Sequence, residues 1–172
     1  ESLHFILPKE LISVENILKN IDTSKVLIYF EPLFLSEKLI KKLQSFSLKN
    51  KTLFYVLQDP IGHLARSGNW HTDIKSDVHT LKQTISLGDS LKWVISIDLG
   101  LFQNTGGSMV QQLAYTLAHA NEYLNLFDGD TLKSVVFKVS VGSNYFFEIA
   151  KLQALRILWQ SLTKEYGLTI DC

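Results

Sequence analysis

Short apolar runs alternate along this chain with segments in which hydrophobic residues recur every three or four positions. Runs rich in β-branched and aromatic residues predict strands at residues 3–7, 26–30, 52–57, 92–98 and 135–141. Helical spacing follows each run, at residues 11–21, 36–46, 76–87, 108–127 and 145–166. About five repeats of strand then helix predict an α/β fold with a parallel sheet, and strands that are apolar on both faces predict helices on both sides of it.

Capping signals sharpen the expected helix boundaries. Ser36 is the expected N-cap of the second helix, whose inner face carries Leu39, Ile40, Leu43 and Phe46. Ser76 or Asp77 is expected to begin the third helix, and Gly88-Asp89 to end it. In the last helix we expect one apolar stripe to face the core: Phe146, Ile149, Ala150, Leu158 and Leu162.

Two polar turns follow the fourth and fifth strands, at residues 99–107 and 142–144. Ligands of parallel sheets collect at the carboxyl ends of the strands, so a site is expected there. The candidate ligand-binding residues are Asp98, Gln103, Asn104, Gly106, Gly107, Ser108, Ser140 and Asn144. Each has a plainer alternative, since glycines allow a tight turn into a helix and Asp98 could cap a turn.

Other candidate chemistry finds little support. The segment from Gln58 to Trp70 is predicted to be a turn-rich loop bracketed by His63 and His71, either a binding loop or a packed surface loop. His119 is expected to be a half-exposed helix histidine. No two histidines are spaced i, i+4 and the one cysteine is Cys172, so no metal site is expected. No Gly-x-Ser-x-Gly elbow or Walker loop is present.

Composition limits the class of protein. The 172 residues are 46% hydrophobic, enough for one domain over residues 1–172 with a sizeable core. A formal net charge of +0 means that the chain has no excess of positive charge to attract nucleic acid or an anionic membrane. Charged or amide residues interrupt every apolar run before ~18 residues, so no membrane span is expected. A lone cysteine fits a reducing compartment, and we expect a cytoplasmic protein.

Two long segments, Asn104–Leu124 and Val141–Trp159, resemble the corresponding strand-to-helix segments of methylmalonyl-CoA mutases. Gln58–Gly62, with Gly68–Trp70 beyond it, is similar to the small-subunit version of that family. The resemblance implies an adenosylcobalamin-dependent isomerase that interconverts methylmalonyl-CoA and succinyl-CoA. It also implies a (β/α)8 TIM-barrel substrate domain and, in two-chain members, a catalytic subunit paired with a paralogous subunit that binds no cofactor.

Departures from the family pattern indicate the second kind of subunit. Catalytic members carry a Tyr-His pair where this chain has Gly100 and Leu101. The family's Lys-x-Arg-Ala-x-Arg helix signature has Gln153 at its first arginine, and the cobalamin signature Asp-x-His-x-x-Gly is absent from the sequence. Leucine cannot donate a hydrogen bond to a thioester carbonyl, and losing such a group typically costs ~10²–10³ in rate. We therefore expect no catalytic residue and no cofactor in this chain, with adenosylcobalamin in the partner subunit.

A complete barrel usually needs ~250 residues, so this chain is expected to form part of one. Unpaired strand edges and uncovered apolar surface favour a heterodimer with the catalytic subunit or self-association. Two alternatives stay open. The barrel could keep a site for CoA or an acyl-CoA, or the chain could be an unrelated enzyme on a doubly wound sheet.

Overall fold

The computed structural model describes residues 2–8, 13–86, 91–127, 132 and 135–170. Contacts between residues divide the chain into two compact units. Unit 1 comprises residues 1–58 and 71–94, and unit 2 comprises residues 59–70 and 95–172. Each unit is described by itself below, and the organisation of the whole as a single domain stays a prediction.

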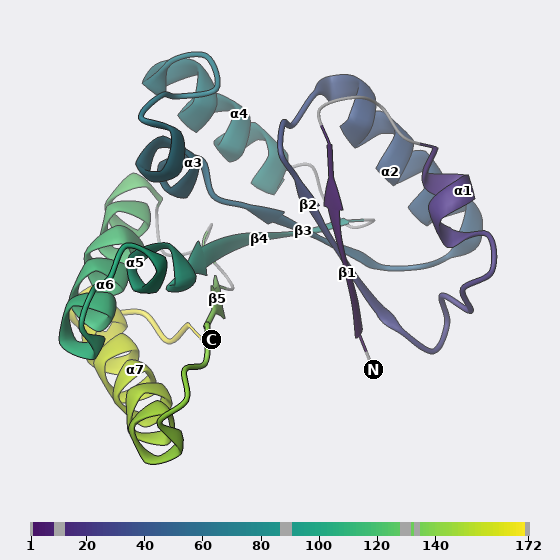
Figure 1. Cartoon of the computed structure of the whole chain (residues 1–172). Helices are drawn as coiled ribbons and strands as arrows, with labels where there is room; N and C mark the ends of the chain where they lie inside the picture. Colours follow the sequence, from purple (N-terminus) through teal and green to yellow (C-terminus); the bar gives the residue numbers. More distant parts are fainter. Residues whose placement is uncertain (1, 9–12, 87–90, 128–131, 133–134, 171–172) are drawn as a thin grey trace. The chain divides into compact units, whose positions relative to one another are not determined.

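Unit 1 is built on three parallel strands in chain order (Figure 1): β1 (Ser2–Leu7), β2 (Leu27–Pro32) and β3 (Phe54–Gln58). In their register Leu3 lies beside Ile28, and Ile28 lies beside Phe54. A buried cluster joins the strands to the helices: Leu7, Val14, Leu18, Ile28, Phe30, Leu39, Leu43, Phe54, Val56 and Leu91. Removing this apolar surface from water is the main force that holds the strands and helices of the unit together.

The helices of unit 1 are α1 (Val14–Leu18), α2 (Glu37–Asn50) and α4 (Ile74–Ser86). The N-cap prediction for Ser36 is confirmed, because its Oγ accepts from the Leu39 N–H at 3.2 Å. The predicted start of α4 is wrong. Asp73 Oδ1 accepts from the N–H groups of Lys75 and Ser76, so Asp73 satisfies the free donors of the first turn. The predicted end at Gly88-Asp89 lies outside the described residues.

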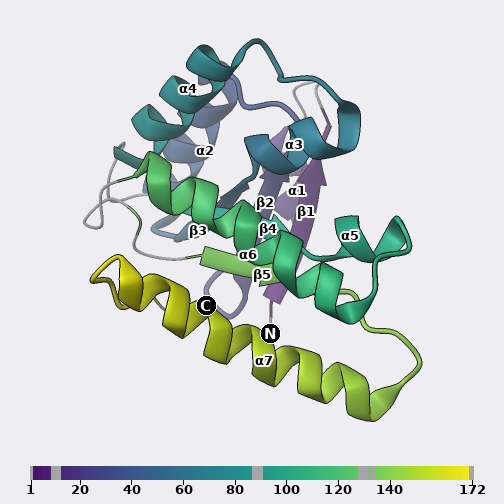
Figure 2. The same cartoon turned by 90° about the vertical axis from the view of Figure 1, so that its left-hand side faces the viewer.

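Unit 2 contains the parallel pair formed by β4 (Leu91–Asp98), from Ile95 onward, with β5 (Val135–Lys138). Two long helices, α6 (Met109–Leu126) and α7 (Tyr145–Glu165), follow the strands and lie side by side (Figure 2). The Phe137 ring meets the buried Trp159 ring edge-on at 5.2 Å, and the indole N–H donates to the Ile170 carbonyl at 2.9 Å. These contacts fix α7 against the strand pair.

Two predicted turns contain short helices. Residues 58–70 were predicted to be a loop, but α3 (Pro60–Ser67) occupies most of this segment. Asp59 caps α3, Pro60 stands in its first turn and Gly68 ends it in the left-handed region at φ 74°, which are ordinary helix signals. The turn at 99–107 likewise contains α5 (Gly100–Asn104).

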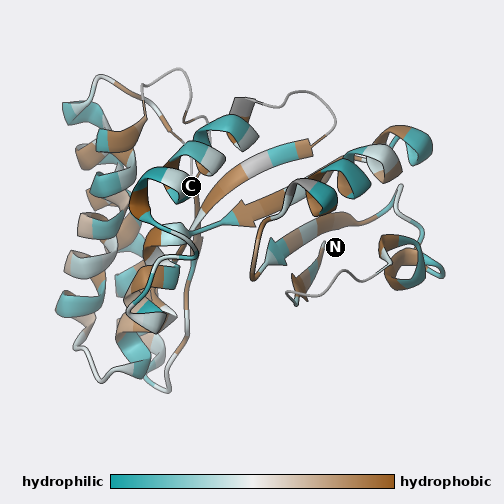
Figure 3. Ribbon diagram, turned by 90° about the horizontal axis from the view of Figure 1, so that it is seen from above, coloured by the Kyte–Doolittle hydropathy of each residue, from teal (hydrophilic) through white to brown (hydrophobic). Residues whose placement is uncertain are grey.

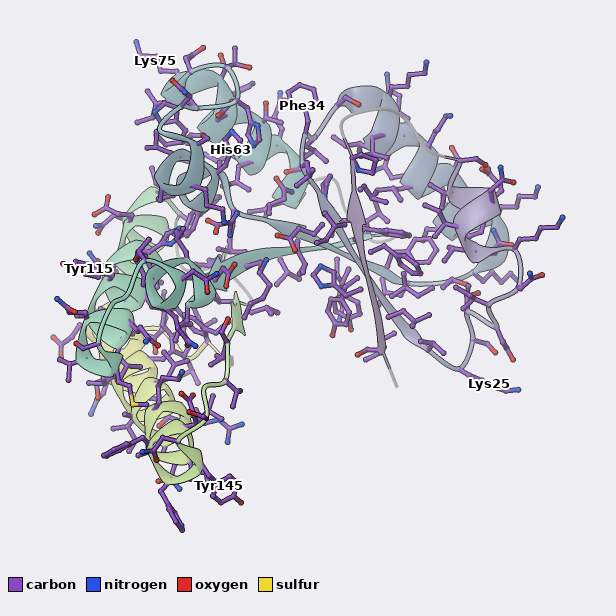
Figure 4. The ribbon with its side chains drawn as sticks, in the orientation of Figure 1. Lys25, Phe34, His63, Lys75, Tyr115 and Tyr145 are labelled. Atoms are coloured by element: carbon purple, nitrogen blue, oxygen red, sulfur yellow. The ribbon has the colours of Figure 1, made fainter. Side chains whose placement is uncertain are left out.

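The prediction for the buried face of α7 is wrong. Its buried residues are Glu148, Lys151, Leu155, Trp159 and Thr163. Four residues of the expected stripe, Phe146, Ile149, Ala150 and Leu158, are exposed instead, Phe146 by 78%. Figure 4 shows the neighbouring Tyr145 projecting from the beginning of the helix. The prediction failed because a cluster of polar side chains determines which face of α7 is buried.

The α/β fold class with parallel pairing is confirmed, and the alternation of strands and helices is compatible with part of a TIM barrel. Figure 3 shows that the strands are mostly hydrophobic, whereas the helices mix hydrophobic and hydrophilic residues. Among the described residues, no helix is long and apolar enough to cross a membrane.

Candidate functional site

The candidate site lies in unit 2, where β4 and β5 end. Asp98 is the last residue of β4, and its two oxygens have different partners. Oδ1 accepts from the Gly100 N–H at 2.8 Å, and Oδ2 accepts from Arg66 Nη2 of α3 at 3.2 Å. Asp98 therefore caps the turn, as the plainer alternative expected, and also holds an arginine at this edge.

Gly100 lies against Ser140, which follows β5. A Cβ built on Gly100 would come within 2.5 Å of Ser140 Oγ and 2.9 Å of Asp98 Oδ1. A side chain at this position therefore requires its neighbours to move. Leu101 is the next residue in the first turn of α5 and is half-buried. The Gly-Leu pair thus lies at the predicted edge, directly after β4.

A buried lysine joins the segments around this edge. Lys151 Nζ donates to the Ser140 carbonyl at 2.9 Å and, at 3.4 Å, to the side-chain oxygens of Gln103 and Gln112. Its Nζ also lies 2.5 Å from Glu148 Oε2, and both side chains are more than nine-tenths buried. The ammonium beside Glu148 lowers the pKa of that carboxyl below its ordinary value of 4.5, against the opposing effect of burial. The hydrogen bonds of Lys151 connect α7 with α5, α6 and the segment after β5.

The prediction that His119 is half-exposed is wrong, because the residue is buried in a second polar cluster. Its Nε2 lies 2.8 Å from Asp59 Oδ1, but off the direction of a hydrogen bond. Asp59 Oδ1 also accepts from the Tyr123 hydroxyl at 2.8 Å and the Gly62 N–H at 2.8 Å. Burial, with Asp59 nearby, raises the pKa of the Tyr123 phenol well above its ordinary value of 10.0. This cluster joins the start of α3 to α6.

The glycines before α6 serve the turn. Gly106 has φ 85°, a conformation that favours glycine, and a Cβ on Gly107 would come within 2.8 Å of the Phe102 carbonyl oxygen. Ser108 forms a capping box with Gln111, in which each side chain accepts from the other's backbone N–H. The capping box engages donors that an anion would use at a helix N-terminus.

The candidate residues thus fall into two groups. The structure brings Asp98, Gln103 and Ser140 together around the end of the strand pair. Asn144 caps α7 by accepting from the Phe147 N–H at 3.3 Å, and Asn104 is exposed at the end of α5. The ligand-binding roles of all the candidate residues stay predictions.

Arg66, Glu148 and Lys151 were not among the candidate ligand-binding residues expected from the sequence. Arg66 belongs to the segment for which a binding loop or a packed surface loop was expected. Glu148 and Lys151 stand at i, i+3 within a mostly apolar helix, a spacing at which an acid and a base can pair. That spacing was the available signal, but burial of the pair depends on the neighbouring helices. Among the described residues, no group of three or more His, Cys, Asp or Glu side chains could hold a metal ion.

Comparisons with known proteins extend over this site. The family model for methylmalonyl-CoA mutase matches residues 36–171. The chain is 40% identical over 79 residues to the methylmalonyl-CoA mutase of Cereibacter sphaeroides, in a match that covers 42% of this chain and 11% of that protein. It is 38% identical over 78 residues to the large subunit from Streptomyces virginiae, with 42% and 11% covered. It is 34% identical over 80 residues to the small subunit from Porphyromonas gingivalis, with 43% and 13% covered.

The matched segment spans about a tenth of the length of these relatives, which are named as a methylmalonyl-CoA mutase, a large subunit and a small subunit. The family model covers far more than half of this chain, including both strands of unit 2 and every residue from α5 through α7. The chain belongs to the methylmalonyl-CoA mutase family.

Proposed function

We propose that this chain is a barrel segment of a small, non-catalytic subunit of an adenosylcobalamin-dependent methylmalonyl-CoA mutase, and that it supports a catalytic partner in a heterodimer. The observation that carries the proposal is the contact between Gly100 and Ser140. At the position where catalytic relatives are expected to have tyrosine, a Cβ would lie 2.5 Å from the Ser140 hydroxyl oxygen, so that side chain would have to move.

The next position supports the same conclusion. Leu101 has no polar atom to direct at a thioester carbonyl, and a group so directed typically contributes ~10²–10³ in rate. The residues at this edge also do not fit a corrin ring, because Gly100 and Leu101 offer neither an aromatic face nor an imidazole. Adenosylcobalamin is therefore assigned to the partner subunit.

The test is an assay of isomerisation by the purified chain, alone and with a catalytic mutase subunit, in the presence of adenosylcobalamin. We expect no turnover by the chain alone, and co-elution with the catalytic subunit on size exclusion. A Leu101→Ala variant is the matched control, because it removes packing without adding a polar group. Assayed without the catalytic subunit, it should show only background turnover. Turnover by the unmodified chain alone would contradict the proposal. The cytoplasmic location stays a prediction.

A second candidate function is binding of CoA or an acyl-CoA without turnover. It is favoured by the convergence of Asp98, Gln103 and Ser140 with the Arg66 guanidinium at the end of the strand pair. Calorimetric titration with CoA tests it, with pantetheine as the ligand that lacks the nucleotide phosphates. A silent titration with both ligands would remove this function and leave the structural role in place.

A further inference from the structure

The two ends of α3 contact the rest of unit 2 in different ways, and the N-terminal end is the buried one. Pro60 and Gly62 are buried, and the Ile61 N–H donates to the Tyr123 hydroxyl oxygen at 3.1 Å. The Tyr123 hydroxyl in turn donates to Asp59 at 2.8 Å. Groups left buried without these hydrogen-bond partners would pay a desolvation cost, so this end is held firmly.

The other end of α3 is solvent-exposed from residue 65 to residue 69. Its backbone bonds are local, as when the Gly68 N–H donates to the Leu64 carbonyl at 2.8 Å. Among the described contacts, the long-range one at this end is the ion pair between Arg66 and Asp98, whose side chains are 39% and 27% exposed. An exposed ion pair contributes little to stability and is screened by salt.

Helix length adds to this difference. α3 has only eight residues, and helices this short are marginal without tertiary contacts. We propose that α3 unwinds from its Arg66 end while its Asp59 end stays anchored, and that this opening frees Asp98 Oδ2 at the end of β4. We call this opening of Leu64–Gly68 the gate, because it withdraws Arg66 from Asp98. This inference goes beyond the proposed function and does not depend on it.

Amide hydrogen exchange of the full chain, followed by NMR, tests the gate. Each rate is divided by the intrinsic rate of that amide. We expect Gly68 to exchange at least about tenfold faster than Gly62, whose N–H is bonded to Asp59. Asp98→Asn removes the charge and can still accept from Gly100. It should speed exchange at Gly68 by about 1.4- to 5-fold, the fold-change equivalent to the ~0.2–1 kcal/mol of an exposed ion pair.

The matched control is Arg156→Gln, which removes an exposed arginine of α7 in the same unit and should leave Gly68 unchanged. Raising ionic strength from about 0.05 M to about 0.5 M should reproduce the effect of Asp98→Asn in the unmodified chain. That arm also provides the test if the variant fails to fold. The gate is overturned if Gly68 responds to neither change. It is equally overturned if Gly62 speeds up as much as Gly68, because α3 would then open as a whole.

Discussion

Gly100 and Ser140 belong to segments that follow two different strands, yet a Cβ on Gly100 would lie 2.5 Å from the Ser140 hydroxyl oxygen. We predict that Gly100→Ala lowers the free energy of unfolding by ~1–3 kcal/mol, because added volume in a packed position forces neighbours to shift. Chemical denaturation followed by circular dichroism measures it. Adding Ser140→Gly should recover part of the loss. Equal losses in the single and double variants would show that the hydroxyl does not limit the space.

The same contact bears on activity. We predict that replacing Gly100-Leu101 by Tyr-His gives no turnover in the isolated chain, because the tyrosine would have to displace the Ser140 side chain and the cofactor is assigned to the partner subunit. Isomerisation assayed with added adenosylcobalamin checks this. The triple variant that also carries Ser140→Gly is the informative control. Turnover in the double variant would show that Gly100 and Leu101 are by themselves the cause of the inactivity of the unmodified chain.

Lys151 and Glu148 test the cost of a buried charge. Lys151→Met leaves the Glu148 carboxylate without its buried counter-charge, so we expect a loss of ~3–5 kcal/mol in the free energy of unfolding. The companion variant Lys151→Met/Glu148→Gln should lose less, because the uncompensated charge is gone. Lys164→Met, at an exposed position of the same helix, should lie within ~0.5 kcal/mol of the unmodified chain. A loss at Lys164 as large as at Lys151 would contradict this explanation.

The lowered pKa of Glu148 predicts a pH dependence with a defined sign. A carboxyl whose pKa is lower in the folded chain than in the unfolded chain stabilises the fold above its unfolded pKa, near 4.5. That contribution is lost as the pH falls below 4.5 and the folded carboxyl becomes protonated. Glu148→Gln should therefore flatten the decline in stability below this pH, measured by urea unfolding at a series of pH values. Glu165→Gln, on the exposed surface of α7, should leave the decline unchanged.

Tyr123 tests the anchor of α3. Tyr123→Phe removes the hydroxyl that donates to Asp59 and accepts from the Ile61 N–H, so we expect a loss of ~1–3 kcal/mol and faster amide exchange at Ile61. Tyr115→Phe is the matched control, because Tyr115 is 54% exposed on the same helix. Unchanged exchange at Ile61 in Tyr123→Phe would show that the hydroxyl does not hold this end of α3.

The amino-acid sequence by itself determined the repeating strands and helices, the parallel pairing and several caps. Ser36 and Ser108 begin helices as their side-chain chemistry predicts, and the buried face of α2 follows from its periodicity. The helices and their caps depend on interactions within a few residues along the chain, whereas the parallel pairing was inferred from the alternation of strands and helices. The sequence also contained Asp59-Pro60 and Gly68 around α3, but its local signals were outweighed by the many turn-forming residues of that segment.

Only the tertiary structure decided which polar groups are buried and which apolar ones are exposed. The periodicity predicted that Phe146 faces the core, whereas the packed helix buries Glu148 and Lys151. A buried charge is stable only where its counter-charge and hydrogen-bond partners converge. For Lys151 the counter-charge is Glu148 of the same helix, and the hydrogen-bond partners come from α5, α6 and the segment after β5. Partners so distant along the chain produce no periodic pattern in the sequence. For the same reason, the closeness of Gly100 to Ser140 and the burial of His119 could be identified only in the folded chain.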